Sequence, residues 1–95
     1  MLRIHVEEQP KVTTLYVEGK LAGDGVDELR RVWDAIRLER PGTDTVVDLC
    51  SVRTVDTIGK KLLSEMHQGG TRLAGSGLCI GHLIKEITGD ATYTD

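Results

Sequence analysis

The sequence has no long apolar run, no excess of one charge and no cysteine framework. No stretch approaches the roughly 20 apolar residues of a membrane-spanning helix. The net charge is −3, with 12 basic and 15 acidic residues mixed along the chain, so a basic stripe suited to general nucleic-acid binding is absent. The N-terminus has no apolar signal-peptide core, and we expect a cytoplasmic location.

Potential metal ligands are equally sparse. Cys50 and Cys79 lack the spacing of a zinc site or a disulfide framework, and we expect two small, largely buried thiols. His5, His67 and His82 do not pair at i+3 or i+4, so no metal pattern emerges. We therefore expect no cofactor.

Two strands are predicted at the start of the chain. Leu2, Ile4 and Val6 alternate with charged residues, which is typical of a strand with one apolar face. A polar turn containing Pro10 follows, and residues 12–18 form a second strand. Because the link is short, we expect an antiparallel hairpin.

A helix is predicted over residues 26–40, after a glycine-rich turn at residues 19–25. Its apolar positions follow the i, i+3, i+4, i+7 spacing of one helical stripe, with Asp24 as the candidate N-cap. The stripe consists of Leu29, Val32, Trp33 and Ile36. Trp33, the only tryptophan, is interpreted as a core residue.

The remaining elements alternate between strand and helix. The pattern predicts a strand at 46–50, a polar turn, a helix at 57–68, a strand at 71–74 and a helix at 78–87. The order β-β-α-β-α-β-α predicts an α/β domain over residues 1–88 with a flexible tail at 89–95. We expect a four-stranded, mostly parallel mixed sheet with an N-terminal antiparallel hairpin. Its strands mostly alternate, which favours helices on one face only and a second face that meets water or a partner.

The start of the helix at 57–68 is the candidate functional surface. Asp56 and Thr57 are both suitable N-caps, and a helix N-terminus at the carboxyl end of a parallel strand attracts anions. Ile58 lies at the border of the apolar arc, either as partial core or as an exposed anchor for a partner. The predicted partner-binding residues are Asp56, Thr57, Ile58, Gly59, Lys60 and Lys61.

Other chemistry is less well supported. The run Gly75-Ser76-Gly77 to Gly81 resembles a dinucleotide fingerprint, but its spacing is wrong by one residue and turn glycines explain it better. Ser64 and His67 lie on one helix without a nucleophile elbow. The pair Asp48 and Asp56 needs no catalytic role, so we expect a protein that is not an enzyme.

Five ordered segments resemble the STAS domain, the family of bacterial anti-sigma-factor antagonists and their relatives. The family pattern is a strand ending in Gly-x-Leu, a strand ending in Asp and a polar turn, Asp-Ser-Ser-Gly, a Leu-rich helix and a strand running into Gly. The matching segments here are Val-Glu-Gly-Lys-Leu at 17–21, Val-Asp-Leu-Cys-Ser at 47–51, Val-Asp-Thr-Ile-Gly at 55–59, Leu-Leu at 62–63 and Arg-Leu-Ala-Gly at 72–75. The resemblance covers roughly residues 2–88.

The resemblance implies a protein–protein interaction module that regulates transcription or signalling. Its partner would be an anti-sigma factor, a kinase-type regulator or a larger regulatory complex, and a homodimer is a further option. In such antagonists the serine just before the motif glycine is phosphorylated, whereas here that position is Ile58. Thr57 stands at the family's other serine and is either only a cap or a phosphorylation site. The alternative is a small-ligand module, because some relatives bind nucleotides or serve lipid transport.

Overall fold

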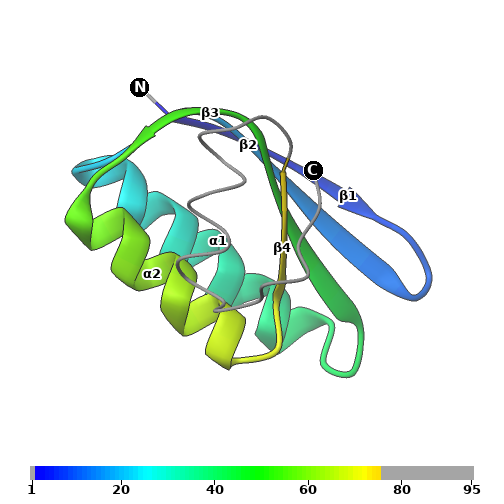
Figure 1. The fold of residues 1–95 in the computed structure, drawn as a ribbon. Helices are drawn as coiled ribbons and strands as arrows, with labels where there is room; N and C mark the ends of the chain where they lie inside the picture. Colours follow the sequence, from blue (N-terminus) through cyan, green and yellow to red (C-terminus); the bar gives the residue numbers. More distant parts are fainter. Residues whose placement is uncertain (1, 76–95) are drawn as a thin grey trace.

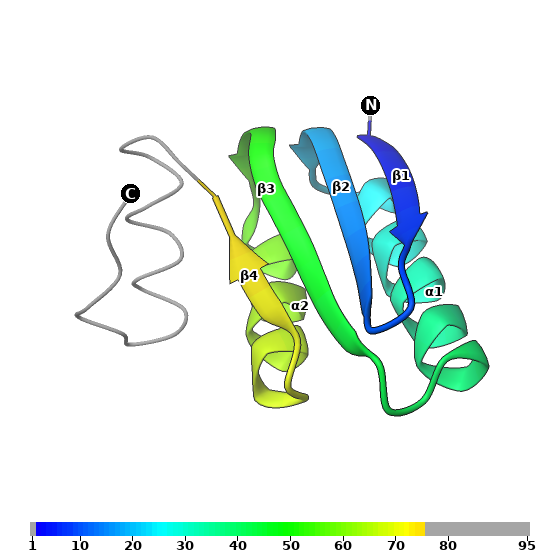
Figure 2. The ribbon, with the colours of Figure 1, turned by 90° about the vertical axis from the view of Figure 1, so that its right-hand side faces the viewer.

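The computed structural model describes residues 2–75, which form a four-stranded sheet and two helices (Figure 1). The elements are β1 (Leu2–Glu8), β2 (Val12–Leu21), α1 (Asp24–Glu39), β3 (Asp44–Val55), α2 (Thr57–Gln68) and β4 (Arg72–Ala74). The strand order is β1-β2-β3-β4, with β1 antiparallel to β2 and the other pairs parallel. Figure 2 shows both helices on the same face of the sheet.

The mixed sheet, its N-terminal hairpin and the one-sided helix layer predicted from the sequence are thus confirmed. The expected helix at 78–87, the domain limit at 88 and the tail lie outside the described residues, as does Cys79. Within residues 2–75, neither helix is long and apolar enough to cross a membrane.

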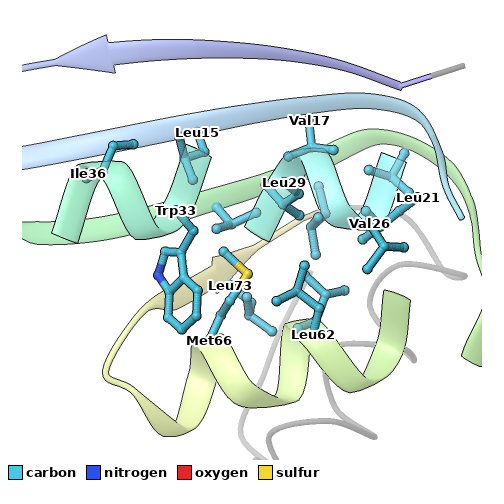
Figure 3. Packing of buried hydrophobic residues seen from close by; sticks show 14 residues of the cluster. Leu15, Val17, Leu21, Val26, Leu29, Trp33, Ile36, Leu62, Met66 and Leu73 are labelled. Carbon is cyan, nitrogen blue, oxygen red and sulfur yellow. The ribbon is translucent and has the colours of Figure 1, made fainter. Parts of the chain in front are cut away.

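The core lies between the sheet and the helices (Figure 3). Alternate residues of β2 and β3 point into it, as the period of a pleated strand requires. They meet the apolar stripes of α1 and α2, where residues three and four apart share a face. The buried apolar residues are Leu15, Val17, Leu21, Val26, Leu29, Trp33, Ile36, Val47, Leu49, Val52, Leu62, Leu63, Met66 and Leu73.

Trp33 joins α1 to the segment after α2, at the edge of this core. Its side chain is 4% exposed, and the indole Nε1 donates a hydrogen bond to the Thr71 hydroxyl at 2.9 Å. The guanidinium of Arg37 lies 4.5 Å above the ring centroid, within range of a cation–π interaction. The core role predicted for Trp33 is confirmed, with a polar contact that periodicity does not reveal.

Two strands are longer than predicted. β2 continues to Leu21 and β3 to Val55, because Gly19, Lys20 and Leu21 pair in parallel with Val52, Thr54 and Val55. The turn predicted at residues 19–25 and the polar turn after residue 50 were therefore wrong at those positions. The pairing partner, which local sequence does not show, supplies hydrogen bonds that keep a glycine-containing segment extended.

An irregularity in β3 replaces the expected polar turn. The pairing register shifts between Tyr16–Asp48 and Glu18–Ser51, and the Asp48 carboxylate accepts a hydrogen bond from the Cys50 amide at 2.9 Å. Cys50 and Ser51 are consequently both exposed, whereas Leu49 and Val52 on either side are buried. The prediction of a largely buried Cys50 thiol was wrong, because an extra residue in a strand changes which side chains face the core.

Candidate functional site

Two strand-to-helix connections lie side by side at the carboxyl ends of the parallel strands β2 and β3 (Figure 1). One connects Leu21 to the start of α1, and the other consists of Asp56 alone, between β3 and α2. The last paired residues of the two strands are Leu21 and Val55. The candidate surface therefore begins where both parallel strands end, as the order of elements predicted.

Asp56 ties the two connections together. Its Oδ1 accepts a hydrogen bond from the Gly59 amide at 2.7 Å, which caps α2, and its Oδ2 accepts from the Gly23 amide at 3.2 Å. The Asp56 amide donates to the Leu21 carbonyl at 3.2 Å. One residue thus fixes the start of α2 relative to the end of β2 and to the loop before α1.

The start of α1 differs from the prediction that Asp24 is its N-cap. Asp24 is the first helical residue, and the cap position is Gly23, whose φ of 57° is in the left-handed region that favours glycine. Gly23 has no side chain with which to cap the helix, and its amide instead binds Asp56. Sequence spacing could not reveal this contact, because the two residues are 33 positions apart.

Gly59 allows α2 to begin close to β2. A Cβ atom at this position would lie 2.6 Å from the Leu21 carbonyl oxygen and 2.9 Å from a methyl group of Val55. Contacts this short would force the backbone or the neighbouring strand to move. The glycine is therefore required by the close approach of the helix and not by an unusual backbone angle.

The side chains around Asp56 and Gly59 face outward. Thr57, Lys60 and Lys61 are exposed, and the Ile58 side chain is 58% exposed. Of the two positions left open by the sequence, Ile58 thus occupies the exposed one. Among the described residues, the other exposed large hydrophobic side chains are Leu38, at 82%, and Tyr16, at 39%.

The capacity of this helix start to bind anions is smaller than the sequence suggested. The Lys60 amide donates to the Asp56 carbonyl, and the Gly59 amide is taken by the Asp56 carboxylate. By helix geometry, only the amides of Thr57 and Ile58 then lack an intrahelical acceptor. The adjacent carboxylate also places negative charge at the helix start, which disfavours a second anion.

A shallow hollow of about 420 Å³ lies on the sheet face opposite the helices, and sequence reasoning missed it. Arg3, His5, Tyr16, Glu18 and Asp48 line it with three other residues. The alternating polar positions of residues 3–7 and 14–18 were the available signal. The Glu7 carboxylate beside the Tyr16 hydroxyl raises the pKa of Tyr16, with further contributions from desolvation, a 3.2 Å hydrogen bond to Glu7 and the charge of Asp48.

The structure does not bring together the other described residues considered for catalysis, cofactor binding or metal binding. Asp48 binds the Cys50 amide, whereas Asp56 caps α2 and binds Gly23. Ser64 is half-buried and His67 is exposed on α2, and of the glycine-rich run only Gly75 is described. No group of three potential metal ligands occurs in the part of the chain that the structure describes.

Solved structures match this fold, although no family model and no curated protein matches the sequence. An anti-sigma factor antagonist from Mycobacterium paratuberculosis has a TM-score of 0.76 at 20% identity, with 94% of this chain and 79% of that chain covered. The anti-sigma factor antagonist SpoIIAA in its unphosphorylated form has a TM-score of 0.64 at 12% identity, with 87% and 82% covered. A protein from Shewanella loihica with a SpoIIAA-like fold has a TM-score of 0.56 at 12% identity, with 85% and 72% covered. These matches confirm the fold expected from the resemblance to STAS domains.

Proposed function

We propose that this chain is a non-enzymatic, STAS-type module that binds a protein partner through residues 56–61, and that it acts like an anti-sigma-factor antagonist in transcription or signalling. The observation that carries the proposal is the exposed Ile58 on a helix start fixed from beneath by Asp56. The fold shared with two anti-sigma factor antagonists supports the kind of partner, an anti-sigma factor or a kinase-type regulator.

The energetics of such a surface favour a protein partner. An aliphatic side chain held in a fixed position gains free energy when a pocket removes it from water, and it loses little conformational freedom in doing so. Lys60 and Lys61, both exposed, are placed to contact acidic groups around that pocket. Ile58 is the proposed anchor, and the lysines are the proposed rim.

Substitution of Ile58 tests this proposal. Ile58→Asp should leave the fold intact and weaken binding to a purified kinase-type anti-sigma factor from the same organism by about 30-fold, the loss typical of an interface hot spot. Leu38→Asp is the matched control, because Leu38 is 82% exposed but lies near the C-terminal end of α1. Titration calorimetry with the wild type and both variants gives the comparison. Equal affinities for all three proteins would remove residues 56–61 from the interface.

Phosphorylation of Thr57 is the regulatory part of the proposal. Thr57 is exposed and carries the one hydroxyl group within residues 56–61. A phosphate there would add about −2 charge beside the Asp56 carboxylate and next to Ile58. Intact mass of protein purified from its host, before and after phosphatase treatment and compared with Thr57→Val, tests it. An unmodified chain under several growth conditions removes this part and leaves the binding proposal standing.

The alternative function, a small-ligand module, is favoured by a different observation. The hollow on the open sheet face offers Arg3, Tyr16 and Asp48 as polar groups. A ligand at a hundred times its dissociation constant would stabilise the fold by about 2.7 kcal/mol. Thermal-shift measurements with nucleotides and lipid headgroups test it, and flat responses from the wild type count against it.

A further inference from the structure

β1 forms one outer edge of the described sheet. β1 is the first strand of the sheet and pairs only with β2 within residues 2–75 (Figure 2). Its seven residues pair with β2 without a register shift, and neither proline nor lysine lies among them. Proteins usually block an exposed edge with a bulge, a proline or charged side chains. β1 has no bulge and no proline, and its charged residues Arg3, Glu7 and Glu8 carry both signs, so a strand with the complementary order of charges is able to pair with it.

The apolar row of β1 is incompletely covered. Leu2, Ile4 and Val6 pack against the core but remain half-buried, whereas Leu15 and Val17 on the neighbouring strand are at most 1% exposed. The helices contact the strands from β2 to β4 more extensively than they contact β1. A strand added beside β1 would therefore remove further apolar surface from water.

Residues 3–7 of β1 are complementary to themselves in one antiparallel register, in which Leu2 and Glu8 face each other at the two ends. When His5 faces His5 of a second copy, all seven residues of the strand find a partner. Arg3 then faces Glu7 of the second copy on the open face of the sheet, and this occurs twice by symmetry. Ile4 faces Val6 of the second copy on the helix side, also twice. Opposite charges and paired aliphatic residues across strands each stabilise a sheet.

We propose that two copies of this chain associate through β1 in this register, so that the four strands described for each copy join into one continuous sheet. The association is isologous, because a twofold axis beside His5 relates the two strands. Arg3 now makes only a loose ion pair with Glu18 at 3.8 Å, with 81% of the Arg3 side chain exposed, so it is able to turn toward Glu7 of the second copy. An interface of this size is small, and the dimer should dissociate on dilution.

Cysteine cross-linking tests the register. In a Cys50→Ser, Cys79→Ser background, His5→Cys should form a disulfide-linked dimer rapidly, because facing residues in adjacent antiparallel strands have Cα atoms within disulfide range. Arg3→Cys is the matched control, since its partner is position 7 and its own copy is about 13 Å away along the strand. Arg3→Cys should cross-link only when mixed with Glu7→Cys. Equal rates for His5→Cys and Arg3→Cys alone would overturn the register.

Charge exchange tests the association itself. Sedimentation velocity over a range of concentrations should show the wild type passing from monomer to dimer. Arg3→Glu and Glu7→Arg should each weaken the dimer by several-fold to about tenfold, and the double variant should recover it, because each symmetric pair contributes a cross-strand interaction. A wild type that stays monomeric at millimolar concentration, or a double variant that does not recover, would overturn the proposal. Ile58→Asp should leave the dimer unchanged, so failure here is distinct from failure of the partner-binding proposal.

Discussion

The two ends of the parallel strands differ in the side chains that they leave exposed. At the amino ends, the guanidinium of Arg40 binds the Thr13 hydroxyl at 2.8 Å and the Gln9 carbonyl, while the Trp33 indole binds Thr71. These polar groups are hydrogen-bonded to other parts of the fold. At the carboxyl ends, Asp56 is also hydrogen-bonded within the fold, but the side chains of Thr57, Ile58, Lys60 and Lys61 are exposed on the surface.

Contacts at the amino ends hold the fold together, whereas the exposed side chains at the carboxyl ends are available to bind a partner. The amino end holds α1 to the hairpin and to the segment after α2, so it serves stability. The carboxyl end uses Asp56 to fix a helix start and presents neighbouring side chains on that support. A binding surface gains affinity when its contact residues are already held in position. We therefore expect substitutions at the two ends to differ in kind: loss of stability at the first, loss of binding at the outward side chains of the second.

Trp33→Ala should give the largest loss of stability. It removes a buried aromatic ring, its hydrogen bond to Thr71 and the cation–π contact with Arg37. The expected loss is about 3–5 kcal/mol in the free energy of unfolding, measured by urea denaturation. Trp33→Phe keeps most of the ring and should lose less. A Trp33→Ala variant within 1 kcal/mol of the wild type would contradict the role given to the amino end.

Gly59→Ala comes next and tests the close approach at the carboxyl end. The added Cβ would meet the Leu21 carbonyl at 2.6 Å, and we expect a loss of about 1–3 kcal/mol from overpacking. Gly69→Ala is the matched control, because a Cβ there would meet its nearest atoms at 3.4 Å and the glycine has a φ of −82°. Equal unfolding midpoints for the two variants would show that α2 can move away from β2 at no cost.

Asp56→Ala should be milder, at about 0.5–2 kcal/mol, the range for loss of a helix cap. Asp56→Asn keeps a carbonyl oxygen for the Gly59 amide but places an amide group toward the Gly23 amide, so its effect should be intermediate. Hydrogen exchange sharpens the test, because the amides of Gly23 and Gly59 should both exchange faster in Asp56→Ala. Faster exchange at Gly59 alone would mean that the bridge to Gly23 is unimportant in solution.

The smallest effect concerns Tyr16 on the open sheet face. Glu7→Gln removes the main cause of the raised pKa of Tyr16, so the phenol should titrate closer to its ordinary value of 10.0. Because the raised pKa favours the neutral phenol in the folded state, its contribution to stability is constant below pH 10 and falls as the pH rises through the raised pKa. Ultraviolet titration in a Tyr93→Phe background measures this. An unchanged titration would exclude Glu7 as the cause.

Periodicity predicted the parts of the fold that depend on local pattern. α2 has the predicted bounds, and the stripe of Leu29, Trp33 and Ile36 is buried as predicted. The errors lie where partners distant in sequence decide the outcome. The continuation of β2 to Leu21 depends on pairing with Val55, and the exposure of Cys50 depends on a register shift. The hydrophobic periodicity of the sequence contains no information about either of these contacts.

The candidate site shows the same division. That a helix begins after Asp56 could be predicted, because capping residues and an apolar stripe are local signals. The second hydrogen bond of Asp56, to Gly23, could not, and neither could the choice between core and surface for Ile58, which the spacing placed at a border. The role of residues 56–61 in partner binding and the modification of Thr57 stay predictions.

The bridge at Asp56 limits how this scaffold can change length. The Asp56 carboxylate accepts hydrogen bonds from the amides of both Gly23 and Gly59. An extra residue in either connection would therefore displace the starts of both helices. Insertions between Leu21 and Asp24 or between Val55 and Thr57 should therefore destabilise the fold. A partner that displaces the start of α2 would also strain the hydrogen bond from the Gly23 amide to Asp56, and with it the connection that leads into α1.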